Sequence, residues 1–372
     1  MPNKVTTQEP LYFFIGTVAE LLKVMPVMQE LQKRGANFKI IGSGQNDITT
    51  SDALGLLGIS NVDVIISDDP IKQSPIGLLG WFIKSFFRAI PKLRREFKGL
   101  KRGQGYIIVH GDTVTTVMGA VLGRLLGRKV AHIEAGYRSG NFLQPFPEEI
   151  DRVLTSYFAK AHFYPYEGLY KNIAKRSGDK INTFYNTSID GLAFAVSQPT
   201  NPKILEEIGS KKFFIFILHR QENLLNEQLV RKLVDYICEE AKKDLTCLFV
   251  THETTYGALQ KFGLLERVEK TPGIIMTKRL RYFDFIKVLN QSEFLMTDGG
   301  GNQQETFFLG KPCIILRNVT EGSEGLGTTT VLSKLDPKVI GDFIKNYANY
   351  AKPPIVPERR PSEIIADYLL SH

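Results

Sequence analysis

Short apolar segments alternate with helical patterns twice along this chain, and this alternation is the feature that most restricts its fold. The predicted strands are residues 11–15, 38–42, 62–66, 106–110, 130–133 and 161–164, then 213–218, 245–250, 273–276, 294–296 and 313–316. Nearly continuous apolar strands separated by helices are typical of parallel sheets covered on both faces. The sequence therefore predicts an α/β protein with two doubly wound, Rossmann-like domains facing a central cleft.

Chain length and a polar segment at residues 198–203 indicate where the chain divides. A single hydrophobic core stops growing at roughly 250–300 residues, and this chain has 372. Residues 1–197 are expected to form the N-terminal domain and residues 198–350 the C-terminal domain. Residues 351–372 are expected to form a tail whose final helix returns to the N-terminal domain.

The cysteines and the apolar runs bear on the compartment. Cys238, Cys247 and Cys313 show neither paired nor metal-like spacing, which indicates buried thiols in a reducing environment. The longest apolar runs are about half of the ~20 residues that a membrane span needs. The amino terminus lacks the charged-then-apolar pattern of a signal peptide. We therefore expect a cytoplasmic protein.

Polar side chains follow the predicted strands of the first domain. Asp112 and Glu134 come directly after two of these strands, and Glu148 opens a predicted helix. Carboxylates that converge at strand ends can act as acids or bases when burial and mutual repulsion tune their pKa values. Helix capping is the alternative for Glu148. His110 and His132 alternate with Asp112 and Glu134, but the spacing matches no zinc pattern, so no metal site is predicted.

The second domain carries a histidine and a glycine run in similar positions. His219 follows a predicted strand, where it suits proton transfer or contact with a phosphate. Gly299, Gly300 and Gly301 precede a predicted helix, and backbone N–H groups at a helix start favour phosphate. A plain tight turn is the alternative for these glycines.

Taken together, these motifs resemble the UDP-N-acetylglucosamine 2-epimerase family, whose fold is shared with the GT-B glycosyltransferases. The resemblance runs over roughly residues 13–332. The motifs that carry it are HGDT (110–113), IEAG (133–136), PEE with Arg152 (147–152), NT with Asp190 (186–190), HRQEN (219–223), TDGGGNQQE (297–305) and GKP (310–312).

The resemblance implies a reaction at carbon 2 of the sugar on UDP-N-acetylglucosamine. UDP is eliminated to give an enzyme-bound glycal, and it is added back after C2 has been protonated on the other face. Asp112, Glu134 and Glu148 would be the acid/base carboxylates, and His219 would assist the phosphate. The reaction implies a nucleotide-sugar substrate, no cofactor and no metal.

The resemblance also implies a set of residues that bind the nucleotide sugar. Glu305 would hold the ribose hydroxyls, while Gly300 and Gly301 would donate backbone N–H groups to the diphosphate. Arg152 would position the carboxylates or the diphosphate. The full binding set is Lys23, Arg152, Gly299, Gly300, Gly301 and Glu305.

The chain departs from the family pattern at its phosphate-binding positions. Val18 and Gly322 stand where the family has arginines, and Gly299 stands where it has serine. Arginine binds phosphate through two parallel hydrogen bonds, so its loss predicts a remodelled diphosphate pocket. The cations expected to compensate are Arg220, Arg279, Arg281 and Arg317.

The net charge of +8 is concentrated in one segment. Residues 72–102 hold nine basic side chains, the first of them Lys72, and one acid, Glu96, which equals the charge of the whole chain. A helical wheel predicts an apolar face of Leu79, Phe82, Ile83, Phe86, Ile90, Leu93 and Phe97, with Trp81 on the basic side. Pro91 predicts a kink or a second helix.

Two interpretations of this segment stay open. It is either a helix packed on its own domain with a solvated basic face, or a helix that binds an anionic membrane surface through residues 78–102. Nothing else in the chain favours nucleic acid as a partner.

The favoured function is a UDP-N-acetylhexosamine 2-epimerase, of the simple or the hydrolysing type, for cell-surface polysaccharide precursors. The alternative is a GT-B-fold glycosyltransferase acting at the membrane surface, which the changed phosphate positions and the basic segment favour. The retained carboxylates disfavour a non-catalytic sensor. A homodimer is the expected assembly.

Overall fold

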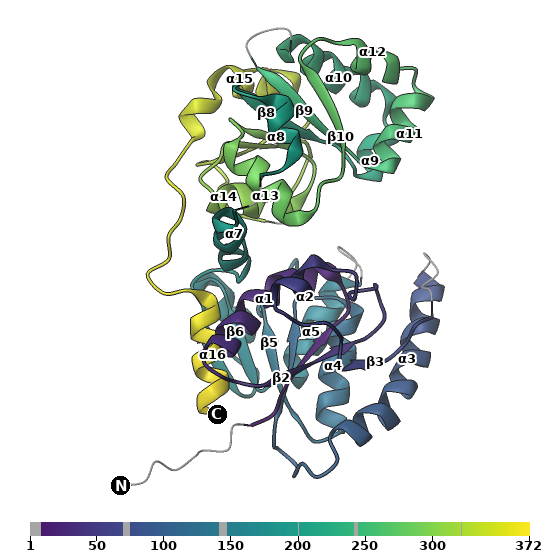
Figure 1. Cartoon of the computed structure of the whole chain (residues 1–372), viewed down its shortest axis with the longest axis vertical. Coiled ribbons are helices and arrows are strands. Elements are labelled where there is room, and N and C mark those ends of the chain that lie inside the picture. Colours follow the sequence, from purple (N-terminus) through teal and green to yellow (C-terminus); the bar gives the residue numbers. More distant parts are fainter. Residues whose placement is uncertain (1–8, 70–74, 141–146, 200, 242–244, 321) are drawn as a thin grey trace. The chain divides into compact units, whose positions relative to one another are not determined.

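The computed structural model describes residues 9–69, 75–140, 147–199, 201–241, 245–320 and 322–372. These residues form two compact units (Figure 1). The first unit comprises Met1–Gly191 and Pro357–His372, and the second comprises Leu192–Val356. The division falls inside helix α7 (Ser188–Ser197), whereas the sequence placed it after residue 197.

The first unit is built on one parallel sheet of seven strands. Their order is β3-β2-β1-β4-β5-β6-β7. The strands are β1 (Leu11–Ile15), β2 (Phe38–Gly42), β3 (Val64–Ile65), β4 (Tyr106–His110), β5 (Lys129–Ile133), β6 (Ala161–Tyr164) and β7 (Asp179–Asn182). Central strands β1 and β4 are buried along their whole length, as the continuous apolar runs predict. Edge strand β7 is polar, so hydrophobicity gave no sign of it.

Helices cover both faces of this sheet. They are α1 (Val18–Lys33), α2 (Asp52–Leu56), α3 (Pro75–Glu96), α4 (Val114–Leu125), α5 (Glu148–Phe158), α6 (Tyr170–Ile173), the start of α7, and α16 (Pro361–Ser371). The terminal helix α16 packs against α1 in this unit (Figure 1). The backbone N–H of Ser362 donates to buried Asp190 at 2.8 Å, and burial raises the pKa of Asp190 to about 6.

The second unit repeats the arrangement with six parallel strands in the order β10-β9-β8-β11-β12-β13. The strands are β8 (Phe213–Ile217), β9 (Thr246–Thr251), β10 (Ile274–Lys278), β11 (Leu295–Thr297), β12 (Cys313–Ile315) and β13 (Thr330–Leu332). The helices are α8 (Lys203–Ile208), α9 (Gln221–Leu224), α10 (Glu227–Ala241), α11 (Glu253–Lys261), α12 (Leu265–Lys270), α13 (Tyr282–Gln291), α14 (Gly300–Phe308) and α15 (Pro337–Asn346). The prediction of two doubly wound sheets is confirmed.

Each sheet reverses its strand order once, and this reversal positions the candidate site. The order changes direction between β1 and β4 in the first unit, and between β8 and β11 in the second. The loops after the two strands at such a point diverge, leaving a crevice at the carboxyl ends where ligands of open α/β sheets bind. Asp112 follows β4, His219 follows β8 and Gly299 follows β11, whereas Glu134 follows β5, the neighbour of β4.

Helix α3 differs from the prediction in some of the residues that it buries. It continues through Pro91 as one helix, so no second helix begins there. Trp81 is buried at 6% exposure, whereas Leu79 and Ile83 are 59% and 48% exposed. The fully buried face consists of Trp81, Ser85, Ala89 and Leu93, and the small side chains of Ser85 and Ala89 suit the close approach of α3 to helix α4. Lys72 lies outside the described residues. No helix in the described ranges is both long and apolar enough to cross a bilayer.

Two helical glycines, one in α4 and one in α3, give a matched test of how closely the helices of the first unit pack on their neighbours. A Cβ atom on Gly119 in α4 would lie 2.8 Å from Val109 and 2.9 Å from Phe14, whereas one on Gly80 in α3 would meet nothing within 4 Å. We expect Gly119→Ala to lower the free energy of unfolding by about 1–3 kcal/mol through overpacking. Gly80→Ala should raise it by about 0.5–1 kcal/mol through helix propensity. Urea denaturation checks both signs, and stabilisation by Gly119→Ala would contradict the packing.

Candidate functional site

The carboxylate of Glu134 lies in a cluster of donors directly after strand β5. Lys23 Nζ on α1 is 3.1 Å from Glu134 Oε1 and 3.0 Å from Oε2. His110 Nε2, at the end of neighbouring strand β4, is 3.0 Å from Oε2, and Asn186 Nδ2 donates to Oε1. The backbone of Glu134 has a φ of 68°, a left-handed conformation that is unusual for a residue other than glycine. The fold therefore holds Glu134 in a costly conformation.

The surroundings of Glu134 keep its carboxylate ionised. Burial alone would raise its pKa, but the positive charge of Lys23, the neighbouring His110 ring and the hydrogen bonds from both outweigh burial and hold the pKa well below its ordinary value. A carboxylate paired in this way stays negative across the physiological range. Glu134 is thus available to accept a proton.

Asp112 is held by Arg152 on helix α5. The guanidinium donates from Nε at 2.9 Å and from Nη2 at 2.6 Å, both to Asp112 Oδ2. Arg152 Nη1 also donates to Glu149 Oε2 at 3.3 Å, and Glu149 accepts the backbone N–H of Ser139 at 2.9 Å. Asp112 is one-third exposed, so it faces solvent while its charge is balanced. The predicted association of Arg152 with a site carboxylate is present.

A further carboxyl group lies in the first turn of α5, and the sequence did not single it out. Asp151 is 6% exposed, and its Oδ2 has no hydrogen-bond partner among the described residues. Burial, and then the negative charges of Asp112 and Glu148, raise the pKa of Asp151 to about 8. Glu148 Oε2 is also buried without a partner in the described part of the chain. Asp112, Glu148 and Asp151 therefore form a second acidic group, in which Asp151 holds a proton at neutral pH.

Glu20 fixes the loop that follows strand β1. Its Oε2 accepts the backbone N–H groups of Gly16 at 2.6 Å and Thr17 at 2.9 Å, and its Oε1 accepts the hydroxyl of Thr113 after strand β4. The buried carboxylate joins the two loops at the strand-order reversal of the first unit. Val18 is the first residue of α1, directly after this loop.

The second unit has a matching arrangement around Asp298. Asp298 is fully buried and accepts the backbone N–H groups of His219 at 3.1 Å and Arg220 at 2.9 Å, and the Asn223 amide at 3.1 Å. His219 Nδ1 lies 2.9 Å from Asp298 Oδ1. Burial alone would raise the pKa of Asp298, but these hydrogen bonds and the His219 ring lower it below its ordinary value.

Asp298 and His252 together fix the orientation of the His219 ring. Because Nδ1 faces Asp298, Nε2 lies on the opposite side of the His219 ring, which is one-third exposed. The ring also stacks on that of His252, with centroids 4.9 Å apart and planes at 19°. The sequence gave His252 no role, since ring stacking between residues 33 positions apart leaves no local pattern.

The glycine run forms the start of helix α14. Gly299 is the residue before the helix, and Gly300 and Gly301 are its first two residues, with open space where their side chains would be. A Cβ on Gly299 would lie 2.7 Å from Asn302 Oδ1 and 3.1 Å from His219 Cε1. Glycine at this position therefore brings the helix start against the His219 ring. Glu305 on the same helix accepts a hydrogen bond from Asn302 at 2.8 Å.

Gly322, one of the two positions where the family pattern has arginine, has a neighbouring side chain close to it. A Cβ on Gly322 would lie 2.7 Å from Oε2 of Glu324, a residue that is only 5% exposed. Of the cations expected to compensate, Arg220 Nη1 lies 3.5 Å from Glu222, and Arg281 Nε lies 3.0 Å from Asp284. Glu321, beside Gly322, lies outside the described residues.

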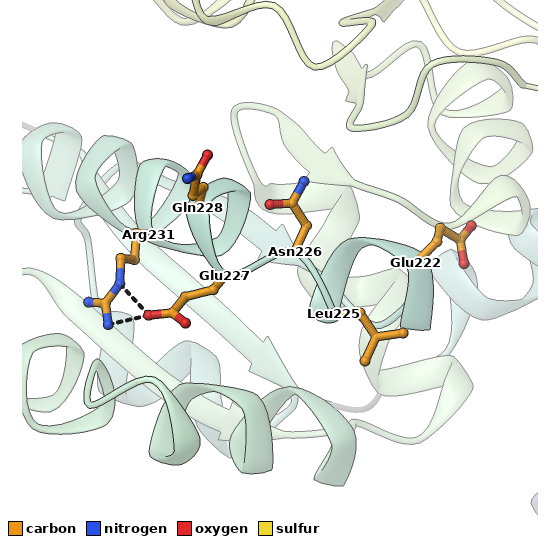
Figure 2. Close-up of a pocket in the computed structure, with 6 residues that line it drawn as sticks. All are labelled: Glu222, Leu225, Asn226, Glu227, Gln228 and Arg231. Carbon is orange, nitrogen blue, oxygen red and sulfur yellow. Dashed lines mark hydrogen bonds and ion pairs between the residues drawn. The ribbon is translucent and has the colours of Figure 1, made fainter.

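His132 and the surface hollow in Figure 2 add no residue to the predicted site. His132 Nε2 donates to the Gly111 carbonyl at 2.8 Å, and burial lowers its pKa to about 3, so it is a neutral core residue. The hollow in the second unit has a volume of about 720 Å³. Its lining residues are Glu222, Leu225, Asn226, Glu227, Gln228 and Arg231, with Glu227 paired to Arg231 (Figure 2). None of them is a predicted site residue.

Comparison with known proteins identifies the family. A family model described as UDP-N-acetylglucosamine 2-epimerase matches residues 29–356. The chain belongs to this family. A relative named UDP-N-acetylglucosamine 2-epimerase from Methanococcus maripaludis is 31% identical over 337 residues, which cover 88% of both chains.

Solved structures of the epimerase family share the fold. The UDP-GlcNAc 2-epimerase of Methanocaldococcus jannaschii matches with a TM-score of 0.80 at 24% identity, covering 96% of this chain and 99% of that one. The Neisseria meningitidis enzyme, solved with UDP-GlcNAc bound, matches with a TM-score of 0.76 at 25% identity, covering 98% and 100%. These matches confirm the predicted GT-B-like α/β fold and the family resemblance.

The raised pKa of Asp151 gives a prediction about stability and pH. The folded protein keeps this proton between about pH 4 and pH 8, where the unfolded chain loses it, so stability falls as pH rises by up to ~1.4 kcal/mol per unit. Asp151→Asn is neutral in both states. We expect the variant to gain stability over the parent as pH rises from 5 to 8 in urea denaturation.

The exposed Asp342 provides the control for this experiment. Asp342→Asn should change stability by a similar amount at every pH in the same range. A stability difference between Asp151→Asn and the parent that stays constant from pH 5 to pH 8 would contradict the assignment.

Proposed function

We propose that this chain is a UDP-N-acetylhexosamine 2-epimerase that acts on UDP-N-acetylglucosamine and inverts carbon 2 of its sugar. Family membership supports this proposal, and relatives with that name have been solved with UDP-GlcNAc bound. The observation that carries it in this chain is the state of Glu134. An ionised, buried carboxylate after a central strand is suited to removing a proton from a sugar carbon.

The reaction begins with elimination. A base takes the C2 proton, the electron pair of the C2–H bond forms a C1–C2 double bond, and the bond from C1 to the phosphate oxygen breaks to release UDP. In the proposal Glu134 is this base. Lys23, His110 and Asn186 contact the Glu134 carboxylate and fix its orientation.

Return to a nucleotide sugar requires a proton on the opposite face of C2. A group that stays protonated near neutral pH can supply it, and two carboxyl groups whose pKa values are driven apart are a recurrent acid/base arrangement. In the proposal the acidic group of Asp112, Glu148 and Asp151 supplies this proton. UDP then adds back to C1, which restores the bond that was broken.

The second unit is proposed to hold UDP through the reaction. Backbone N–H groups of Gly300 and Gly301 at the start of α14 favour a diphosphate. His219, fixed by Asp298, is proposed to donate to the leaving phosphate oxygen, and Glu305 to accept the ribose hydroxyls. Protons and a leaving group are exchanged without net oxidation, so the proposal includes no cofactor.

Location and assembly belong to the same proposal. Free, buried Cys238, Cys247 and Cys313 support a reducing compartment such as the cytoplasm. A homodimer remains the expected assembly. Hydrolysis of the intermediate to free sugar and UDP is the variant reaction that product analysis distinguishes.

Incubation with UDP-N-acetylglucosamine in deuterated water tests the reaction. We expect deuterium at C2 in the substrate and in its C2 epimer, because C2 must lose and regain a proton. Proton NMR follows the loss of the C2 signal and shows whether UDP and free sugar accumulate. Release of UDP with an intact C2–H bond would exclude the epimerase and favour glycosyl transfer or simple hydrolysis.

Glu134→Gln tests the proposed base separately. The amide keeps the size of the side chain but removes the negative charge, so C2 exchange should fall by about 10²- to 10⁴-fold. The matched control is Glu206→Gln at an exposed position of α8, where exchange should be unchanged. Equal rates for Glu134→Gln and the parent would remove Glu134 from the mechanism.

Asp298→Asn tests the orientation of His219. The neutral amide removes the charge that faces the His219 ring and brings an N–H group toward backbone donors, so we expect turnover to fall by about 10- to 100-fold. Asp235→Asn is the control, because Asp235 pairs with Arg267 in the same unit and neither residue belongs to the proposed site. Steady-state kinetics measures both variants, and undiminished turnover in Asp298→Asn would refute the orienting role.

A further inference from the structure

Helix α3 exposes three large apolar side chains in one row. Leu79, Ile83 and Phe87 follow one another at intervals of four residues, so they lie on the same helix face one turn apart. Their exposed fractions are 59%, 48% and 67%. The sequence had assigned the first two to the buried face. A row of this kind is typical of a surface that meets a partner.

The opposite face of α3 is part of the domain core. Trp81, Ala89 and Leu93 pack in the cluster that contains strands β1 and β4. Lys92 Nζ donates to the carbonyl oxygens of Ile65 and Ile66 at 2.6 Å and 3.2 Å, which fastens the helix beside the edge strand β3 (Figure 1). The helix is therefore already anchored, and the exposed row is additional to its core contacts.

Cations border the apolar row. Between residues 75 and 102 the chain has eight basic side chains and one acidic side chain. That acid, Glu96, pairs with Lys39. Lys84 and Arg88 both approach the single carboxylate of Asp69, at 2.7 Å each. Arg94 and Arg95 are the further exposed cations on α3 itself, while Lys98, Lys101 and Arg102 are exposed in the segment after the helix ends at Glu96. The face thus combines apolar area with a large excess of positive charge.

We propose that this face of α3 docks on the surface of an anionic lipid bilayer. Leu79, Ile83 and Phe87 would enter the boundary between headgroups and acyl chains, while the bordering cations contact anionic headgroups. Helices that lie in the membrane interface combine these two features. The docking goes beyond the proposed catalytic function and does not depend on it.

The positive charge of this face of α3 favours an anionic lipid surface over a second copy of the chain as its partner. A two-fold contact through α3 would place the same patch against itself, so the cations of one copy would face those of the other. Like charges brought together at an interface cost several kcal/mol. An anionic bilayer complements the charge and also accepts the apolar row. A homodimer would then use a different face.

Vesicle co-sedimentation of the full chain tests the proposal. We expect binding to phosphatidylglycerol vesicles at low salt, little binding to phosphatidylcholine vesicles, and release as salt rises. Phe87→Ser should lower the partition coefficient roughly tenfold. Arg94→Gln should lower it about fivefold. Both side chains are exposed, so folding should be retained, and circular dichroism checks it.

Controls elsewhere on the surface keep the result specific. Val356→Ser removes an apolar side chain that is 86% exposed, and Lys203→Gln removes an exposed cation, so neither should change the partition coefficient. Absence of binding at low salt overturns the proposal, as does an equal loss in the controls. A change of oligomeric state in Phe87→Ser, measured by size-exclusion chromatography with light scattering, also overturns it and identifies a second copy as the occupant.

Discussion

A buried carboxylate at the strand-order reversal of each unit is the interaction on which the site depends. Glu20 in the first unit and Asp298 in the second each accept two consecutive backbone N–H groups from the loop after a central strand. Glu20 also accepts the hydroxyl of Thr113, which lies on the other side of the reversal in its unit. Asp298 follows β11, so its contact with the ring of His219, which follows β8, crosses the reversal in the second unit. A buried charge without partners would cost several kcal/mol, so these loops are fixed in the conformation that satisfies it.

The fixed loops give the carboxyl groups of the first unit different neighbours, so their pKa values differ. Glu134 faces Lys23 and His110, which lower its pKa, whereas burial and two negative neighbours raise the pKa of Asp151. A base and an acid of the same chemical type thus coexist at one pH. The left-handed backbone of Glu134 is understandable in these terms, because strain is retained where the surrounding contacts over-determine it.

The fold was predictable because burial on both faces of a parallel sheet leaves continuous apolar runs. Edge strands β7 and β13 escaped prediction, since an edge needs less apolar sequence. Asp112, Glu134 and His219 were identifiable from their places after strands. Asp151 and Asp298 were not assigned a role, because a helix-start aspartate and a loop aspartate acquire one only through burial and distant neighbours. The predicted apolar face of α3 was wrong for Leu79 and Ile83, whereas its other members are buried or pack against the core. A helical wheel gives weight to large apolar residues, so it missed Ser85 and Ala89, which the close packing of the helix buries.

The structure gives a local reason for glycine at two of the positions where the chain departs from the family pattern, residues 299 and 322. A Cβ at position 322 would lie 2.7 Å from Oε2 of the buried Glu324, and one at position 299 would lie 2.7 Å from Asn302 Oδ1 and 3.1 Å from His219 Cε1. A side chain at either position therefore requires its neighbours to shift, and glycine avoids this. In the proposed function the diphosphate would be contacted by backbone N–H groups at the start of α14 and by His219, in place of the guanidinium groups of the family pattern. Backbone N–H groups bind phosphate without bringing a full charge, so such a pocket would hold UDP less tightly and release it more readily.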